Sequence, residues 1–400
     1  SSSSAGTGNA GDITIHAQDQ VLFDGTTPDG QVASGALSQV EVDSRGQGGD
    51  VNILTDRLTV TNGARLSSTT AGQGDAGDVV VAVREQAVFS GMSMDGQFTS
   101  GALSQVESRA TGMGGDVQIS GPVLEILDGA QLNASTDGNG AAGDVIVDGR
   151  EVRLNEGLIA VESMSGSAAG TMRLQSDRVI LEDNSLISAE SDTVDGGEIF
   201  LMLDHLLLMR NGSGISATAG NDQAGGNGGN VNIRVPFIVA IRDENSDITA
   251  NAFAGSGGRV FIMARGVFGL EPRPELTGLS DITASSERGP IGIIELNNID
   301  SSFVQNSLVE LPDDLIDSDV LVADSCVARY QDTESTFTIV GSSLPEGPAV
   351  STGESYSVGT VQAVGDGAEG SDWELGDEIQ EPTGVYALAD GRLVMGQECS

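Results

Sequence analysis

Five aspartates that follow a glycine at repeated spacing are the first residues whose type and order could do chemistry. They are Asp12, Asp50, Asp78, Asp116 and Asp144, each within a phrase close to Gly-(Gly/Ala)-Gly-Asp-Val-x-Ile. Carboxylate oxygens bind Ca²⁺ well, so stacked copies of the phrase would form a calcium ladder. The alternative is that each carboxylate accepts hydrogen bonds from nearby backbone N–H groups and closes its glycine turn. We expect the turn-closing role, because Ca²⁺-binding β-roll sequences repeat in nonapeptide steps, a spacing that this chain lacks.

Other candidates for catalysis or cofactor binding are sparse. His16 and His205 are the two histidines, and we expect both at the surface or at a strand edge. Asp313-Asp314 is a paired carboxylate in an acidic, proline-flanked stretch, which is typical of a solvated turn. The chain has no Gly-x-Ser-x-Gly motif and no lysine to end a phosphate-binding loop. The sequence therefore predicts no catalytic residue and no cofactor, with Ca²⁺ at the aspartates as the exception to test.

Cys326 and Cys399 are the two cysteines, and neither belongs to a Cys-x-x-Cys or Cys/His cluster. A zinc site is not expected from that pattern. In a secreted chain the two would most simply form one disulfide. Two free thiols are the alternative.

The glycine–aspartate phrase is part of a longer repeat. Its copies at Gly11, Gly49, Gly77, Gly115 and Gly143 are separated alternately by 38 and 28 residues. More degenerate copies continue towards residue 292. The phrase Ser-Gly-Ala-Leu-Ser-Gln-Val-Glu occurs at 34–41 and again at 100–107, an offset of 66 residues. Since other segments share that offset, the chain has lengthened by duplication.

Each repeat contains three short runs in which apolar residues alternate with polar ones. In residues 49–75 the first run has Val51 and Ile53, the second Leu58 and Val60, and the third Ala64 and Leu66. A period of two predicts β-strands, and no segment has helical periodicity. The same alternation assigns the inward positions of a later repeat to Ile199, Leu201, Leu206, Leu208, Ile215 and Ala217.

Three strands in about 28 residues cannot bury their apolar faces alone, but stacked copies can, with each strand paired in parallel to its equivalent in the next repeat. The predicted fold is an all-β, right-handed parallel β-helix of about ten repeats, roughly 45–50 Å long at ~4.8 Å per strand. The extra residues of the 38-residue repeats, such as 24–35, should bulge outward as loops. Prolines at 236, 272, 274 and 290 mark loops, and residues 271–279 are expected as a loop insertion.

We expect four segments along the chain. Residues 1–300 are the β-helix, 301–345 an acidic, turn-rich cap with one strand at 335–340, and 346–372 a flexible linker. Residues 373–400 are expected as a β-hairpin around Ala389-Asp390-Gly391. Trp373 and Tyr386 would help to pack this tail.

Composition limits the partners. The net charge is −41, with 18 Arg and no Lys, which disfavours nucleic acid and anionic membranes. Aromatic residues make up only 4% of the chain, which fits a thin core of small branched side chains. No signal peptide and no apolar run of 18 residues occurs, so membrane insertion is not expected, and we expect an internal or C-terminal part of a longer precursor.

The Gly-Gly-Asp-Val-x-Ile phrase and the Asn-Gly-Ala-x-Leu-Ser turn strand resemble the large filamentous-haemagglutinin-like exoproteins of cyanobacteria. The tail from Leu311 through Cys326 to the strand at 337–340 is similar as well, so the resemblance covers about residues 8–400. It implies a β-helical protein exported by two-partner secretion through an outer-membrane transporter and attached loosely to the cell surface. The family's N-terminal secretion and haemagglutination domain is not in this sequence, and no catalytic residues come with the resemblance.

The function expected from these observations is that of a secreted surface adhesin or stalk, not an enzyme. Its partners would be host or matrix glycans or surface proteins. Two other functions stay open: a polysaccharide lyase or hydrolase on a β-helix, and a calcium-dependent surface-layer or matrix component.

Overall fold

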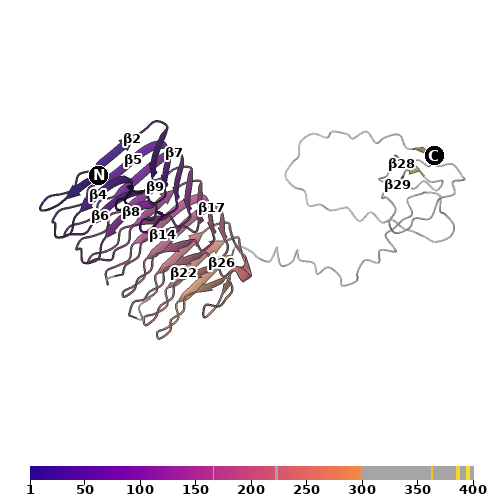
Figure 1. Ribbon diagram of the computed structural model, residues 1–400. Coiled ribbons are helices and arrows are strands. Elements are labelled where there is room, and N and C mark those ends of the chain that lie inside the picture. The colour runs from indigo at the N-terminus through magenta and orange to yellow at the C-terminus, as the bar shows by residue number, and fades with distance from the viewer. Residues whose placement is uncertain (165, 221–223, 299–361, 364–383, 388–392, 397–400) are drawn as a thin grey trace. The chain divides into compact units, whose positions relative to one another are not determined.

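The computed structural model describes residues 1–164, 166–220, 224–298, 362–363, 384–387 and 393–396 (Figure 1). Within these ranges the regular elements are β-strands, apart from one 3-10 turn, η1 (Arg242–Glu244). The chain divides into two compact units, Ser1–Ser307 and Leu308–Ser400. The fold is therefore all-β in the part of the chain that is described.

Residues 1–298 form two sheets of parallel strands, which lie side by side in Figure 1. The larger sheet combines the first and second strand of each repeat in 15 strands: β2 (Ile13–His16), β3 (Gln20–Asp24), β5 (Val51–Thr61), β7 (Val79–Ser90), β9 (Val117–Ser120), β10 (Val123–Leu127), β12 (Val145–Asp148), β13 (Glu151–Asn155), β15 (Thr171–Glu182), β17 (Glu198–Met209), β19 (Asn230–Arg234), β20 (Phe237–Ala240), β22 (Arg259–Ala264), β23 (Gly266–Phe268) and β26 (Ile293–Asn298).

The smaller sheet has 11 strands, which are the third strands of nine repeats, the strand β1 that precedes them and the short strand β24: β1 (Ser2–Ser4), β4 (Gly35–Val40), β6 (Arg65–Thr70), β8 (Gly101–Val106), β11 (Gln131–Asn133), β14 (Leu158–Ala160), β16 (Leu186–Ser188), β18 (Gly214–Ser216), β21 (Asp247–Thr249), β24 (Glu271–Pro272) and β25 (Asp281–Thr283). We number the repeats 1 to 10 by their first strands, which are β2, β5, β7, β9, β12, β15, β17, β19, β22 and β26.

Strand pairing joins each repeat to the next in register. Val51 pairs with Val79, Val79 with Val117, and Val117 with Val145. In the third strands Leu66 pairs with Ala102 in the same way. The all-β class and the parallel pairing of equivalent strands are therefore confirmed.

The pairings also form a closed ring of six strands, β7, β9, β12, β15, β13 and β10. The ring arises because β7 and β15 are long strands that carry both the first and the second segment of their repeats. In the two repeats between them, the first and second segments are separate strands, β9 and β10 in one repeat and β12 and β13 in the next. The ring is thus made of stacked equivalent segments.

The core is a set of apolar columns that point inward from all three strands. Val51, Leu58 and Leu66 each expose 1% or less of their surface. Their equivalents in the following repeats are buried to a similar degree, and Phe89 is the largest fully buried side chain. Small aliphatic residues fill this interior, as the low aromatic content predicted.

One inward assignment from the sequence was wrong. In β17 the buried residues are Leu207 and Met209, whereas Leu206 and Leu208 are half-buried and point outward. The register between β15 and β17 shifts at the corner, where Ser176 pairs with Leu203 but Arg178 pairs with Leu206. Because β17 has one more corner residue than β15, its alternation runs unbroken from Ile199 to Met209, and the inward positions of its second segment lie one residue later than the spacing of β15 predicts.

The last repeats and the tail differ in part from expectation. The segment predicted as a loop insertion at 271–279 begins with the short strand β24, which pairs in parallel with β25. In the tail, β28 (Gly384–Ala387) and β29 (Leu393–Gly396) pair antiparallel, and β27 (Gln362–Ala363), within the predicted linker, pairs with β28. The strand predicted at 335–340, the cap at 301–345 and the rest of the linker lie outside the described residues.

Candidate functional site

The five aspartates form a column at the start of the first strand in repeats 1 to 5. In every step, Oδ1 of one aspartate accepts a hydrogen bond from the backbone N–H of the aspartate in the next repeat. From Asp12 to Asp144 the four N–O distances are 3.0, 2.9, 2.8 and 2.9 Å. Thr171 replaces the sixth aspartate and donates its N–H to Asp144 Oδ1 at 2.8 Å. The column therefore joins neighbouring repeats, whereas the sequence predicted that each aspartate would act within its own turn.

The electrostatics of the column follow from its stacking. Burial is the main cause that raises the pKa of Asp78, and the charges of Asp116 and Asp50 raise it further. Arg173 Nη1 lies 3.0 Å from Asp144 Oδ2 and forms an ion pair at the last aspartate. Within the described residues no three Asp, Glu, His or Cys side chains are grouped so as to hold a metal ion. The column supplies fixed acceptors for backbone N–H groups.

A second polar column lies inside the stack, where Ser38, Ser68 and Ser104 are almost fully buried. Ser68 Oγ accepts the N–H of Gly77 at 2.8 Å and donates to the carbonyl of Gly49 at 2.9 Å. The other two serines repeat this bridge. From repeat 5 the equivalent glycines donate directly to a backbone carbonyl, as Gly143 does to Ala134 at 2.9 Å. Sequence reasoning missed this column, although the repeated Ala-Leu-Ser-Gln-Val phrase carried the signal.

A group of carboxylates lies at the end of the third strands of repeats 3 to 6, and sequence reasoning also missed it. Parallel bridges from Val106 to Thr136, Ser163 and Ser191 align its members. Burial, followed by neighbouring negative charges, raises the pKa of Glu162. Burial likewise raises the pKa of Glu107 and Asp137. The cluster is Glu107, Asp137, Glu162, Glu190 and Asp192. Its signal in the sequence is an acidic residue that recurs shortly after the third strand in repeats 3 to 6.

Two ordered loops project from the 38-residue repeats. Antiparallel bridges close them, between Thr26 and Ala33 and between Met92 and Thr99. Each loop has an aspartate turn in which Oδ1 accepts a hydroxyl hydrogen bond at 2.6 Å, at Asp29 in the first and at Asp95 in the second. These hydrogen bonds are the main cause that lowers the pKa of both aspartates. The chain thus presents two closely similar loops, in the segments where the sequence predicted outward bulges.

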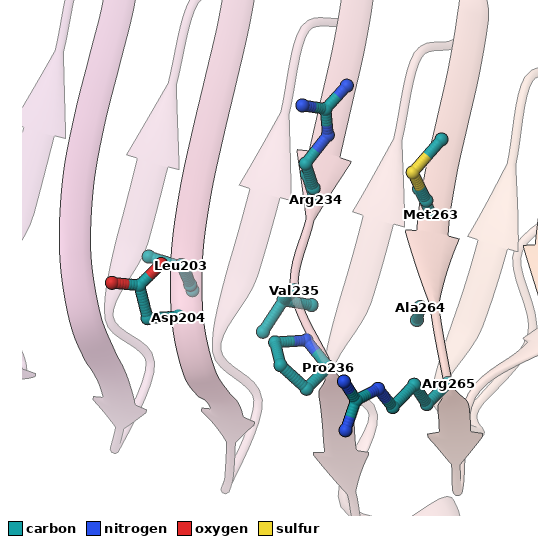
Figure 2. Close-up of a pocket in the computed structure, with 8 residues that line it drawn as sticks. All are labelled: Leu203, Asp204, Arg234, Val235, Pro236, Met263, Ala264 and Arg265. Atoms are coloured by element: carbon teal, nitrogen blue, oxygen red, sulfur yellow. The ribbon is translucent and has the colours of Figure 1, made fainter.

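A shallow pocket of about 240 Å³ lies at the corner between the first and second strands of repeats 7 to 9. Figure 2 shows Arg265 extending towards Pro236, while Arg234 points away from it. Asp204 is the acidic side chain of the lining, and Leu203, Val235, Met263 and Ala264 complete it. A lone carboxylate beside two arginines that diverge does not provide the pair of carboxylates that glycoside hydrolysis uses.

The remaining candidates do not come together. His16 and His205 are both exposed, in β2 and β17. Cys326, Cys399, Asp313, Asp314 and Trp373 lie outside the described residues, so the disulfide and the acidic turn stay predictions. The same holds for the packing of Tyr386, whose side chain is not described.

In the described part of the chain, no helix has the length and apolar character needed to cross a membrane. A scan against protein-family models finds no match, and searches of curated proteins and of solved structures find none either.

Proposed function

We propose that this chain is part of a secreted bacterial cell-surface stalk or adhesin, built as a right-handed parallel β-helix. The in-register pairing of strands over ten repeats supports a coil that advances by one strand spacing per repeat. The right hand is proposed because crossovers between parallel strands strongly prefer it. Such a coil would be roughly 45–50 Å long over its ten repeats at ~4.8 Å each.

The observation that carries the proposal is the role of the polar residues that recur from repeat to repeat. The aspartate and serine columns bond the backbone of one repeat to that of the next. Residues that link one repeat to the next stabilise an elongated stack, which is the architecture that a stalk requires. The two projecting loops are copies of one design, and repeated loops favour presentation of a surface over a unique catalytic cleft.

The proposed partners are an outer-membrane transporter of the two-partner secretion type and, at the cell surface, matrix or host glycans or proteins. The net charge of −41 supports an extracellular location, because it keeps a long chain soluble and repels anionic membranes.

Protease treatment of intact producing cells tests the location. We expect an antibody against residues 1–298 to lose its signal when protease is added outside unbroken cells, while a periplasmic control protein survives. A chain that is degraded only after the cells are lysed would contradict a surface location.

The enzyme alternative is supported by the Glu162 cluster, because a raised carboxyl pKa is what a general acid requires. Incubation with pectin, alginate and other uronates should release no reducing ends above background if the stalk proposal is right. Release that disappears in Glu162→Gln would establish the enzyme instead.

The calcium-dependent alternative rests on the aspartate column. We expect Ca²⁺ at millimolar concentration to leave the thermal midpoint unchanged, because each Oδ1 already accepts a backbone N–H. A midpoint that rises with Ca²⁺ but not with Mg²⁺, together with Ca²⁺-dependent assembly, would favour the surface-layer function.

A further inference from the structure

The outward face of the second strands changes character along the stack. In one column of paired residues, repeats 1 to 5 present a mixture of apolar and polar side chains, which are Leu22, Thr59, Val88, Glu125 and Arg153. The same column then presents Ile180, Leu208, Val239 and Phe268 in repeats 6 to 9. The neighbouring column likewise changes from Glu151 and Arg178 to Leu206 and Phe237. The additional corner residue of β17, described above, is what places Leu206 and Leu208 on the outward face.

The apolar patch is defined by Leu206, Leu208, Phe237, Val239, Ile241 and Phe268. Phe237, Ile241 and Phe268 expose 42%, 43% and 43% of their surface, and the other three are half-buried. On the polar half of this face, cross-strand ion pairs hold the outward side chains, such as Arg153 with Glu182 at 2.7 Å. Exposed fractions of this size on large side chains amount to roughly 300–400 Å² of apolar surface, which is the size of the largest apolar patch on a typical monomer, a patch that is often functional.

We propose that this apolar patch is a self-association surface, on which a second copy of the chain packs face to face. A flat patch without charge at its centre is self-complementary, as a two-fold interface requires. The distribution of charge also favours self-association through this part of the chain. Residues 198–298 contain 11 acidic and 7 basic residues, whereas residues 1–197 contain 28 acidic and 9 basic residues. Within residues 1–298, the repulsion between two copies is therefore weakest around the apolar patch.

The area limits the strength of the dimer. A standard stable interface buries about 800 Å² on each partner, and the apolar patch offers roughly half of that. We therefore expect a reversible dimer with a dissociation constant of about 10–500 µM. Because apolar burial brings two like-charged chains together, added salt should strengthen the association.

Sedimentation of the full 400-residue chain from about 5 µM to about 1 mM, in 0.15 M and 0.5 M NaCl, tests the proposal. We expect the average mass to rise from monomer towards dimer, and more so at the higher salt. Val239→Glu copies the Glu125 of the same column and should raise the dissociation constant by about 30-fold or more. Leu208→Thr, copying Thr59, should weaken association in the same direction.

The matched control is Val88→Glu, which lies in the same column but in repeat 3, outside the apolar patch. Its dissociation constant should equal that of the unchanged chain, and all variants should keep the unchanged chain's β-rich circular dichroism. A chain that stays monomeric at about 1 mM would overturn the proposal. Equal association of Val239→Glu, or equal weakening by Val88→Glu, would also overturn it. A monomer that sediments with anionic phospholipid vesicles would identify a membrane as the occupant instead.

Discussion

Asp78 offers the sharpest test of how neighbouring repeats are joined. Its Oδ1 accepts the N–H of Asp116 at 2.8 Å, and its own N–H donates to Asp50 Oδ1 at 2.9 Å. Asp78→Asn and Asp78→Ala both remove the negative charge, but only Asn keeps an oxygen for the Asp116 N–H. Losing the acceptor of a partly buried N–H costs about 1–2 kcal/mol, so Ala should be less stable than Asn by that amount.

Urea unfolding measures the difference in free energy, and in a thermal melt it should appear as roughly 2–5 °C. Amide hydrogen exchange gives the local readout, since the Asp116 N–H should exchange faster in the Ala variant than in the Asn variant. Equal stabilities and equal exchange of the two variants would refute the reasoning, because the side-chain oxygen would then be irrelevant.

The pH dependence of Asp78 has a definite sign. Its folded-state pKa is raised, chiefly by burial, so the folded chain binds this proton more tightly than the unfolded chain. The charged carboxylate therefore costs stability above the folded pKa, and the cost disappears as the pH falls through that pKa. Asp78→Asn should be slightly more stable than the unchanged chain at pH 7, by less than about 1 kcal/mol. The advantage should vanish in acid.

Three further changes follow from contacts elsewhere in the stack. Asp281→Ala removes a fully buried carboxylate that accepts hydrogen bonds from Arg273 and Thr277. It should lower the free energy of unfolding in urea by about 3–5 kcal/mol. Glu271→Ala removes an exposed partner of the same arginine and should lower that free energy little. The raised pKa of Glu162 means that its charged form costs stability at pH 7 and that the unchanged chain gains stability as the pH falls. Glu162→Gln should therefore be more stable than the unchanged chain at pH 7 and should gain less stability on acidification. A thermal midpoint with the same pH dependence in both chains would contradict this. Gly49→Ala would place Cβ 2.4 Å from backbone atoms of the preceding repeat and should lower the thermal midpoint clearly, while Gly225→Ala, with no atom within 4 Å of its Cβ, should not.

Much of the stack could be predicted because its causes are local. The alternation at Val51 and Ile53 indicates which residues point inward, and the recurring glycine–aspartate phrase indicates which strands are equivalent and pair. Those signals need no knowledge of the third dimension. They therefore predicted the parallel sheets and most of the core columns.

The errors came from features that exist only between repeats. The donor to each aspartate is the N–H of the next repeat, so it can be identified only when the stacking register is known. The inward residues of β17 were assigned one position early because β17 has one more corner residue than β15, which shifts the register between the two strands near Leu203. The apolar patch depends on the same shift, and the Glu162 cluster depends on alignment across strands that are far apart in the sequence.

The central claim is that equivalent strands stack in parallel at one spacing per repeat, and distances between spin labels test it most directly. Asn52, Arg173, Asn232 and Glu295 belong to one outward column, in repeats 2, 6, 8 and 10. With both native cysteines replaced by serine, labels placed pairwise with position 52 should lie about 19, 29 and 38 Å apart, at ~4.8 Å per repeat. Distances that fail to grow in proportion to the number of repeats would contradict the stack.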